Sequence, residues 1–243
     1  LANGEFIKFL DDDDWLASGA LFLEFERLKI LNANICYGSY KTVNAEGNTL
    51  IDFSQDYPDD LMAAVLSRSI TTCIFKFSYR RSFINDLFWS RETKSPHDFH
   101  FLASVALKEP KHVPSNVFVG YYRQHNGYRE ARRIRVETDP SLARVEIIQL
   151  FIWQLQEQNK LTDERLLAAV EGLWKCAHFK AAYDLNAFEY IFTKIENFIP
   201  GYLPKRPFKL LSIFDWILTP RIVEYIIYPI RYFKLRFVSK SKN

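Results

Sequence analysis

Four consecutive aspartates, Asp11 to Asp14, are the residues of this chain best suited to chemistry. They follow the apolar run FIKFL, which favours a strand, whereas aspartate is a poor strand residue. The pattern predicts a strand that ends at the aspartates and brings several carboxylates to the edge of a sheet, where open α/β folds place their ligands. A divalent cation such as Mg²⁺ or Mn²⁺ would relieve their mutual repulsion and share its remaining positions with substrate phosphates. The alternative, from these residues alone, is a solvated acidic loop that caps a helix.

The elements that must position these aspartates follow a mixed α/β pattern up to about residue 130 and an all-helical pattern after Asp139. Strands are expected at 4–10, 35–43, 49–53, 71–81 and 117–123, and helices at about 16–31, 58–67 and 98–107. Further helices are expected at 140–158, 162–179, 185–198 and 213–238, the last of them broken near Pro220 and Pro229. The predicted domains are 1–130, 139–199 and a tail at 205–243, with a linker candidate at 200–207.

Composition places the chain among soluble globular proteins. It has 243 residues, 48% hydrophobic and 25% charged, which excludes disordered, collagen-like and disulfide-scaffold classes. Its three cysteines are widely spaced and form no CxxC pair, so buried reduced thiols in a cytosolic protein are expected, with a reactive thiol as the alternative. There is no apolar stretch of roughly 18 to 20 residues and no signal-peptide pattern at the start, so we predict neither export nor a spanning helix.

The net charge of +3 is unevenly distributed. Residues 205–243 contain nine Lys/Arg and two acids, a charge of +7, which leaves −4 for the rest of the chain. The tail also mixes Ile, Phe and Trp with its basic residues, a pattern typical of a helix that lies on an anionic membrane surface. The alternative is a helix packed on the preceding domain or in an oligomer. A nucleic-acid partner is not expected, because there is no recognised motif and the body is acidic.

The segment LANGEFIKFLDDDDWL resembles the central signature of family 2 glycosyltransferases with the GT-A fold. Asp11 and Asp13 fall on the two aspartates of that family's DxD motif, Asp14 on a common extra aspartate, and Asp12 on the variable position. The resemblance implies that Asp11 and Asp13 bind the donor, with Asp11 near the ribose, and that both belong to the metal site.

Three further segments resemble the same family in the same order. FKFSYRRSFINDL resembles a strand followed by a re-entry segment, and SPHDFHFLASVAL resembles the helix that carries the catalytic base, which Asp98 matches. This sequence has His97 where the family more often has glutamate. GYYRQHN resembles the closing strand, in which His125 would complete the metal coordination. Alone, His125 is better explained as a half-buried histidine, and Asp98 as a helix cap.

The resemblance covers about residues 1–128 and implies a GT-A-type, Rossmann-like mixed sheet. It also implies that the family's first nucleotide-binding units would precede Leu1. The expected activity is inverting, metal-dependent transfer of a sugar from a UDP-, GDP- or dTDP-sugar to a glycan or lipid-linked acceptor in cell-surface polysaccharide biosynthesis. Such an enzyme would be cytoplasmic, with peripheral contact to the inner face of the membrane. We expect the first turn of a helix to keep Asp98 ionised, as a base must be.

Several alternatives remain open at this level. The chain could be an inactive glycosyltransferase-like module that only binds a glycan or partner. An Asp-nucleophile phosphatase would also begin with a strand and Asp-x-Asp, but Asp14 and Trp15 do not fit its usual continuation. Arg80 and Arg81 could contact phosphate, although solvated surface arginines are favoured. Trp89 could stack on an acceptor sugar or belong to the core.

Overall fold

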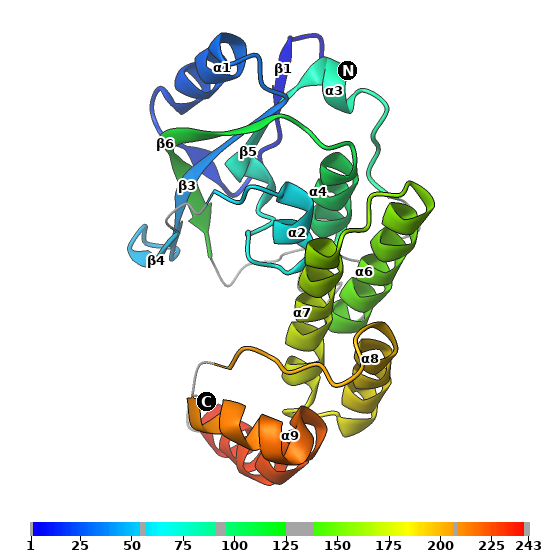
Figure 1. Cartoon of the computed structure of the whole chain (residues 1–243). Coiled ribbons are helices and arrows are strands. Elements are labelled where there is room, and N and C mark those ends of the chain that lie inside the picture. Colours follow the sequence, from blue (N-terminus) through cyan, green and yellow to red (C-terminus); the bar gives the residue numbers. More distant parts are fainter. Residues whose placement is uncertain (1, 54–56, 91–95, 125–138, 207–208, 241–243) are drawn as a thin grey trace. The chain divides into compact units, whose positions relative to one another are not determined.

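The structure is a computed structural model that describes residues 2–53, 57–90, 96–124, 139–206 and 209–240. The chain divides into two compact units, one of residues 1–65 and 69–137 and one of residues 66–68 and 138–243. The strands of the first unit are β1 (Phe6–Lys8), β2 (Trp15–Leu16), β3 (Ile35–Val43), β4 (Thr49–Phe53), β5 (Phe77–Arg80) and β6 (His112–Arg123). Its helices are α1 (Ala20–Ile30), α2 (Leu61–Leu66), α3 (Arg81–Ile84) and α4 (His97–Leu107) (Figure 1).

The first unit is built on one mixed sheet in the order β1-β5-β3-β6-β2, with β4 paired to the remaining part of β3. β3 and β6 run parallel, and the other pairs among the described strands are antiparallel. β3 is buried at seven of its nine residues, as expected of a strand with neighbours on both sides and helices on its faces. The predicted hairpin of residues 35–43 and 49–53 is present.

Helices cover both faces of this sheet, and two successive residues of β5 show how. Ser78 donates a hydrogen bond to Glu24 of α1, whereas the ring of Tyr79 packs edge-on against Phe101 of α4. Because successive side chains of a strand point to opposite faces, α1 lies on one face and α4 on the other. The core accordingly has two parts, a cluster under α1 in which Phe6 and Phe25 pack against small and aliphatic residues, and an aromatic cluster under α4.

The structure differs from the sequence-based expectation at two places near the aspartates. The predicted strand at 4–10 is regular only at Phe6–Lys8, and Trp15 and Leu16, predicted to begin a helix, form the short strand β2. The predicted strand at 71–81 begins with a 3₁₀ turn at Ile74–Lys76, so its regular part is β5. A stretch of two or three residues is too short for its hydrophobic pattern to distinguish a strand from a helix or a turn.

The second unit is helical among its described residues, with α6 (Pro140–Glu157), α7 (Asp163–Lys180), α8 (Leu185–Phe198) and α9 (Lys209–Lys240). The side chains of Asp139, Thr162 and Asp184 accept hydrogen bonds from the first backbone amides of α6, α7 and α8. Each such cap stabilises a helix by about 1 kcal/mol, which explains why the three predicted starts agree with the structure to within one residue.

Helix α9 is interrupted at Thr219, which has φ 69° and ψ 148° and precedes Pro220. A threonine at positive φ is strained, and proline cannot supply the backbone donor that would continue the helix. The break predicted near Pro220 is therefore present, whereas Pro229 lies inside the second segment. No helix within the described residues combines the length and apolar character needed to cross a membrane.

Candidate functional site

The carboxylates of Asp11, Asp13 and Asp14 form a cluster in the loop between β1 and β2. One oxygen from each lies within 4.8 Å of the others, and the three side chains range from exposed at Asp11 to buried at Asp14. A turn closes the loop, because the amide of Asp14 donates to the carbonyl of Asp11 at 3.2 Å. Three carboxylates at this spacing offer the hard oxygen ligands that Mg²⁺ and Mn²⁺ prefer.

The far end of this loop is held by β6. Asp14 Oδ1 accepts a hydrogen bond from the backbone N–H of Arg123 at 2.9 Å, and Trp15 pairs with Tyr121 in the ladder between β2 and β6. Gly120 makes this approach possible, since a β-carbon at that position would lie 2.3 Å from the carbonyl oxygen of Trp15. The carboxylate cluster is thus fixed to the end of β6.

The near end of the loop is held by a buried ion pair. Lys8 Nζ lies 2.6 Å from Glu24 Oε2 of α1, and the two side chains are 3% and 0% exposed. Ser78 contacts both groups, at 3.1 Å from Lys8 and 3.2 Å from Glu24. Burial lowers the pKa of Lys8 and raises that of Glu24, and their mutual attraction opposes both shifts. β1 therefore enters the aspartate loop from a fixed position.

Asp98 lies in the first turn of α4 and belongs to the same site. Burial, followed by the negative charge of Asp11, raises the pKa of the Asp98 carboxyl from 3.8 to about 6. The direction of this shift corrects the expectation that the start of a helix favours the ionised form of Asp98, since burial and a neighbouring carboxylate outweigh the helix dipole. A pKa near 6 still leaves the carboxylate form predominant at pH 7, and it suits a group that must accept a proton.

Two residues not singled out by sequence reasoning also face these carboxylates. Burial and then the charges of Asp14, Asp98 and Asp11 raise the pKa of Cys73 well above its ordinary value. Burial and then Asp98 do the same for Tyr79 of β5. Cys73 is therefore held as a neutral thiol at the site. The only feature of the sequence that could have indicated this role of Cys73 is its position just before the segment that leads into β5.

Trp89 forms part of an aromatic cluster on the α4 side of the sheet. Its ring stacks on Phe101 with centroids 4.5 Å apart and contacts the ring of Phe9 at 5.6 Å. The side chain remains 37% exposed. Trp89 thus combines the two interpretations given by the sequence, a core contact on one side and an accessible surface on the other.

Arg80 serves a structural purpose rather than an anion-binding one. Its guanidinium pairs with Glu5 at 2.7 Å and donates to the carbonyls of Ala33 and Leu28, at the end of α1. Arg81 is exposed, and its backbone N–H donates to the carbonyl of Glu5. The favoured interpretation as a solvated surface residue therefore fits Arg81 but not Arg80, whose side chain is only 19% exposed.

The other predicted site residues are placed less directly. His97 begins α4 next to Asp98, and burial followed by the proximity of His97 lowers the pKa of His100. Asp12 lies in the aspartate loop but outside the cluster of three carboxylates. His125, the expected third metal ligand, lies outside the described residues, two positions after Arg123.

Sequence comparison finds no match for this chain, either among protein-family models or among curated proteins. Solved structures match its fold. The crystal structure of S. aureus TarS residues 1–349 in complex with UDP-GlcNAc has a TM-score of 0.60 at 17% identity, over 92% of this chain and 68% of that one. The complex of the same TarS fragment with UDP gives 0.54 at 16%, over 92% and 67%.

This chain spans about two thirds of those TarS fragments and 40% of a longer TarS structure, which it matches with a TM-score of 0.52. At 16–17% identity these matches establish the fold. The predicted α/β class with a GT-A-type mixed sheet and a helical C-terminal region is therefore confirmed, and the resemblance to glycosyltransferases holds at the level of the fold.

Proposed function

We propose that this protein is an inverting, metal-dependent glycosyltransferase that uses a nucleotide-sugar donor. The observation that carries the proposal is the meeting of Asp98 with the carboxylate cluster of Asp11, Asp13 and Asp14, on a fold shared with a protein crystallised with UDP-GlcNAc. A proton acceptor beside a cluster of hard oxygen ligands is the combination that transfer from a diphosphate requires.

The residues of the loop fit a divalent cation. Their carboxylate oxygens lie within 4.8 Å of one another, and all three are the donor type that Mg²⁺ or Mn²⁺ takes. Asp13 and Asp11 would hold the ion, with His125 as a further ligand. A bound cation would neutralise charge that develops on the departing diphosphate. Asp11, at the exposed side of the cluster, would also lie against the ribose of the donor.

Asp98 would act as the general base. Its carboxylate takes the proton of an acceptor hydroxyl as that oxygen forms a bond to the anomeric carbon of the donor sugar. The bond between the anomeric carbon and the diphosphate oxygen breaks in the same displacement, so the configuration inverts and a nucleoside diphosphate leaves. Asp98 is partly buried, and burial is the main reason that its pKa is raised toward the range that suits a general base.

We further propose a donor class, an acceptor class and a cellular location for this enzyme. The donor is a UDP-, GDP- or dTDP-sugar, with UDP sugars favoured by the TarS complexes. The acceptor is a glycan or lipid-linked molecule of cell-surface polysaccharide synthesis, and the partly exposed ring of Trp89 is suited to stack on it. We place the protein in the cytoplasm, peripherally at the inner face of the membrane. No nucleic-acid partner is proposed.

The test is release of nucleoside diphosphate from a panel of nucleotide sugars, with added Mn²⁺ or Mg²⁺ and with a chelator. Asp13→Ala should abolish the metal-dependent release, and Asp98→Asn should abolish transfer while calorimetry still detects donor binding. Asp12→Asn is the matched control, since Asp12 shares the loop but not the carboxylate cluster, and it should retain activity.

Unchanged turnover in both Asp13→Ala and Asp98→Asn would refute the assignment. Donor and Mn²⁺ binding without any product from the unmodified protein would instead support a binding module that has lost catalysis. A phosphoaspartate trapped at Asp11 would support the phosphatase alternative.

A further inference from the structure

Both acidic residues of α9 are buried. Asp215 and Glu224 are 2% and 0% exposed. Arg206, which precedes the helix and whose side chain is 1% exposed, binds both of them. Its Nε and Nη2 lie 2.5 Å and 2.7 Å from the two oxygens of Asp215, and its Nη1 pairs with Glu224. A bidentate guanidinium of this kind neutralises carboxylates that would be costly to bury alone.

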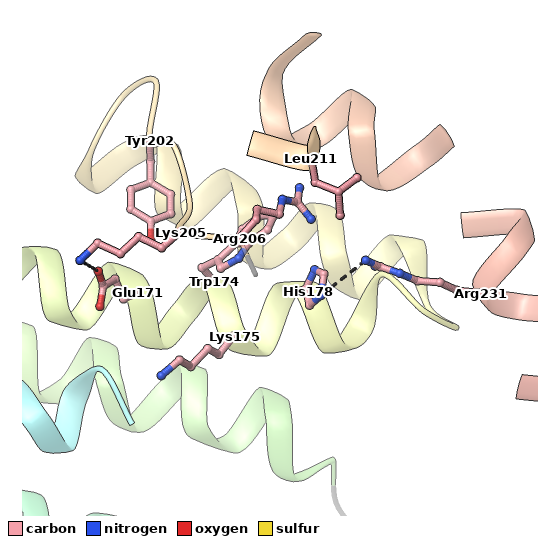
Figure 2. A pocket seen from close by; sticks show the side chains of 9 residues that line it. All are labelled: Glu171, Trp174, Lys175, His178, Tyr202, Lys205, Arg206, Leu211 and Arg231. Carbon is pink, nitrogen blue, oxygen red and sulfur yellow. Dashed lines mark hydrogen bonds and ion pairs between the residues drawn. The ribbon is translucent and has the colours of Figure 1, made fainter. Parts of the chain in front are cut away.

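Glu224 has two more partners. Arg231 of α9 pairs with its second oxygen, and His178 Nδ1 of α7 lies 2.8 Å from its first. Arg206, His178 and Arg231 also line a cavity of about 430 Å³ in this unit, and Figure 2 shows the three side chains converging from separate elements. An ion-pair network of Arg206, Arg231 and His178 thus joins the inner side of α9 to α7. Both acidic residues of the tail, Asp215 and Glu224, are paired within this Arg206 network.

The outer side of α9 is apolar. Among the residues of α9 whose side chains are described, the exposed large hydrophobic ones are Leu210, Ile213, Phe214, Trp216, Ile217, Ile222, Tyr225, Ile226, Ile230 and Phe233. The ring of Tyr225 also contacts Phe188 of α8. Trp216 is 76% exposed and Ile230 is 69% exposed. Exposed apolar residues in this number, five on each of the two segments of α9, are unusual for a surface that faces only water. We call these ten residues the outer face of α9.

The charge that accompanies the outer face is basic. Arg221 is about half exposed while paired with Glu189 of α8, and Lys205, 89% exposed, is paired with Glu171 of α7. Lys234, Arg236, Lys240 and Lys242 follow in the sequence. Because residues 205–243 contain no acid besides Asp215 and Glu224, the tail itself contributes no exposed carboxylate side chain. The carboxylate next to Tyr225 is that of Glu189 of α8, which is paired with Arg221.

We propose that the outer face of α9 is a docking surface for an anionic lipid bilayer, and that the Arg206 network creates this surface by withdrawing both acids. An interfacial helix binds through its buried apolar area together with attraction to anionic headgroups, at about 1 kcal/mol for each basic residue near the surface. A second copy of this chain is a poorer occupant, since pairing two such faces would bring two tails of charge +7 together. The proposal is independent of catalysis.

Vesicle flotation tests the surface directly. The full chain should float with vesicles of phosphatidylcholine mixed with phosphatidylglycerol, should bind pure phosphatidylcholine weakly, and should be released by high salt. Trp216→Glu should weaken binding roughly tenfold or more, because it places a carboxylate in the outer face. Phe179→Glu is the matched control. Its residue is 58% exposed on α7, and this variant should bind like the unmodified chain.

A second set of variants tests the network. Arg206→Ala should weaken vesicle binding although the outer face is unchanged, because Asp215 and Glu224 lose their shared partner. The triple variant Arg206→Ala, Asp215→Asn, Glu224→Gln should recover binding, since the carboxylates are gone. Urea unfolding of both variants separates this effect from a loss of folding, since a purely structural role of Arg206 predicts that vesicle binding changes only in step with stability.

Three outcomes would overturn the proposal: equal binding to neutral and anionic vesicles, no binding to either, or concentration-dependent dimerisation that Trp216→Glu abolishes. A second assay separates a loss of membrane binding from a loss of the proposed catalysis. It measures nucleoside diphosphate release by Trp216→Glu without vesicles and with a water-soluble acceptor. That release should equal the rate of the unmodified chain.

Discussion

The carboxyl group of Asp98 is close enough to that of Asp11 for the negative charge of Asp11 to raise its pKa. The two residues come from different elements, one from the loop after β1 and the other from the first turn of α4. Burial of Asp98 contributes more to the shift than Asp11 does. The site therefore holds a carboxyl group whose charged form is disfavoured by the fold, and this has consequences for stability as well as for activity.

Asp98→Asn should stabilise the protein while it abolishes transfer. The pKa of Asp98 is near 3.8 in the unfolded chain and about 6 in the folded chain. At pH 7 the ionised carboxylate is therefore less stable in the folded than in the unfolded state, and this lowers the free energy of unfolding. The shift corresponds to about 3 kcal/mol at most, and we expect roughly 1–2 kcal/mol because solvent screens a partly accessible group. Urea unfolding at pH 7 measures the gain, which should disappear at pH 4, where the aspartate is largely protonated in the folded state. A loss of stability at pH 7 would contradict this prediction.

The rate of transfer should follow the ionisation of Asp98. With its pKa near 6, the base form is lost as the pH falls through 6, so kcat/KM should decline about tenfold for each pH unit below that value. Saturating Mn²⁺ should move this limb to lower pH, because a cation beside Asp11 cancels the charge that raises the pKa of Asp98. A pH profile recorded at low and high Mn²⁺ concentration tests the shift. An acidic limb that stays in place would show that Asp11 does not set it.

Glu24→Ala should be strongly destabilising. It leaves the ammonium of Lys8 buried without its carboxylate, which typically costs about 3–5 kcal/mol. The matched control is Asp52→Ala, which removes the carboxylate from the exposed pair with Lys41 and should cost less than about 1 kcal/mol. Denaturant unfolding followed by circular dichroism compares the two variants. Equal effects would mean that the buried pair contributes no more than an exposed one.

Gly120→Ala should displace β2 and loosen the carboxylate cluster. Its β-carbon would lie 2.3 Å from the Trp15 carbonyl, so the backbone must move, at a cost of about 1–3 kcal/mol. Mn²⁺ affinity, measured by calorimetry, should fall together with stability. At Gly4 the nearest atom to an added β-carbon is 3.3 Å away, and Gly4→Ala is expected to leave metal binding unchanged. Normal Mn²⁺ affinity in Gly120→Ala would argue against the role assigned to β6.

The sequence predicted those features that depend on strong local signals. β1 ends at Lys8, shortly before the aspartates, and the capping residues Asp139 and Thr162 mark the starts of α6 and α7, because a side-chain oxygen there satisfies backbone amides locally. The meeting of Asp98 with Asp11 was predicted only through family resemblance, since no local pattern carries a contact between a loop and a distant helix.

The features that were missed depend on tertiary contacts. β2 is only two residues long and exists because Gly120 lets β6 approach Trp15. The raised pKa of Asp98 comes from burial, which the helix position alone could not indicate. Cys73 was predicted to be a buried thiol, but its place beside three carboxylates depends on the path of the chain through the 3₁₀ turn.

The aspartate loop is tied at both ends, by Lys8 to Glu24 and by Asp14 to the backbone of Arg123. The residues between these two anchors are held as well, by the ring contacts of Phe9 with Tyr79, Trp89 and Phe101 and by the turn from Asp14 to Asp11. A ligand that binds there has little chain entropy to remove, so the free energy of its contacts goes largely into affinity rather than into ordering the loop. The loop is in this sense a preorganised receptor, and we expect its backbone to change little between the free and the cation-bound protein.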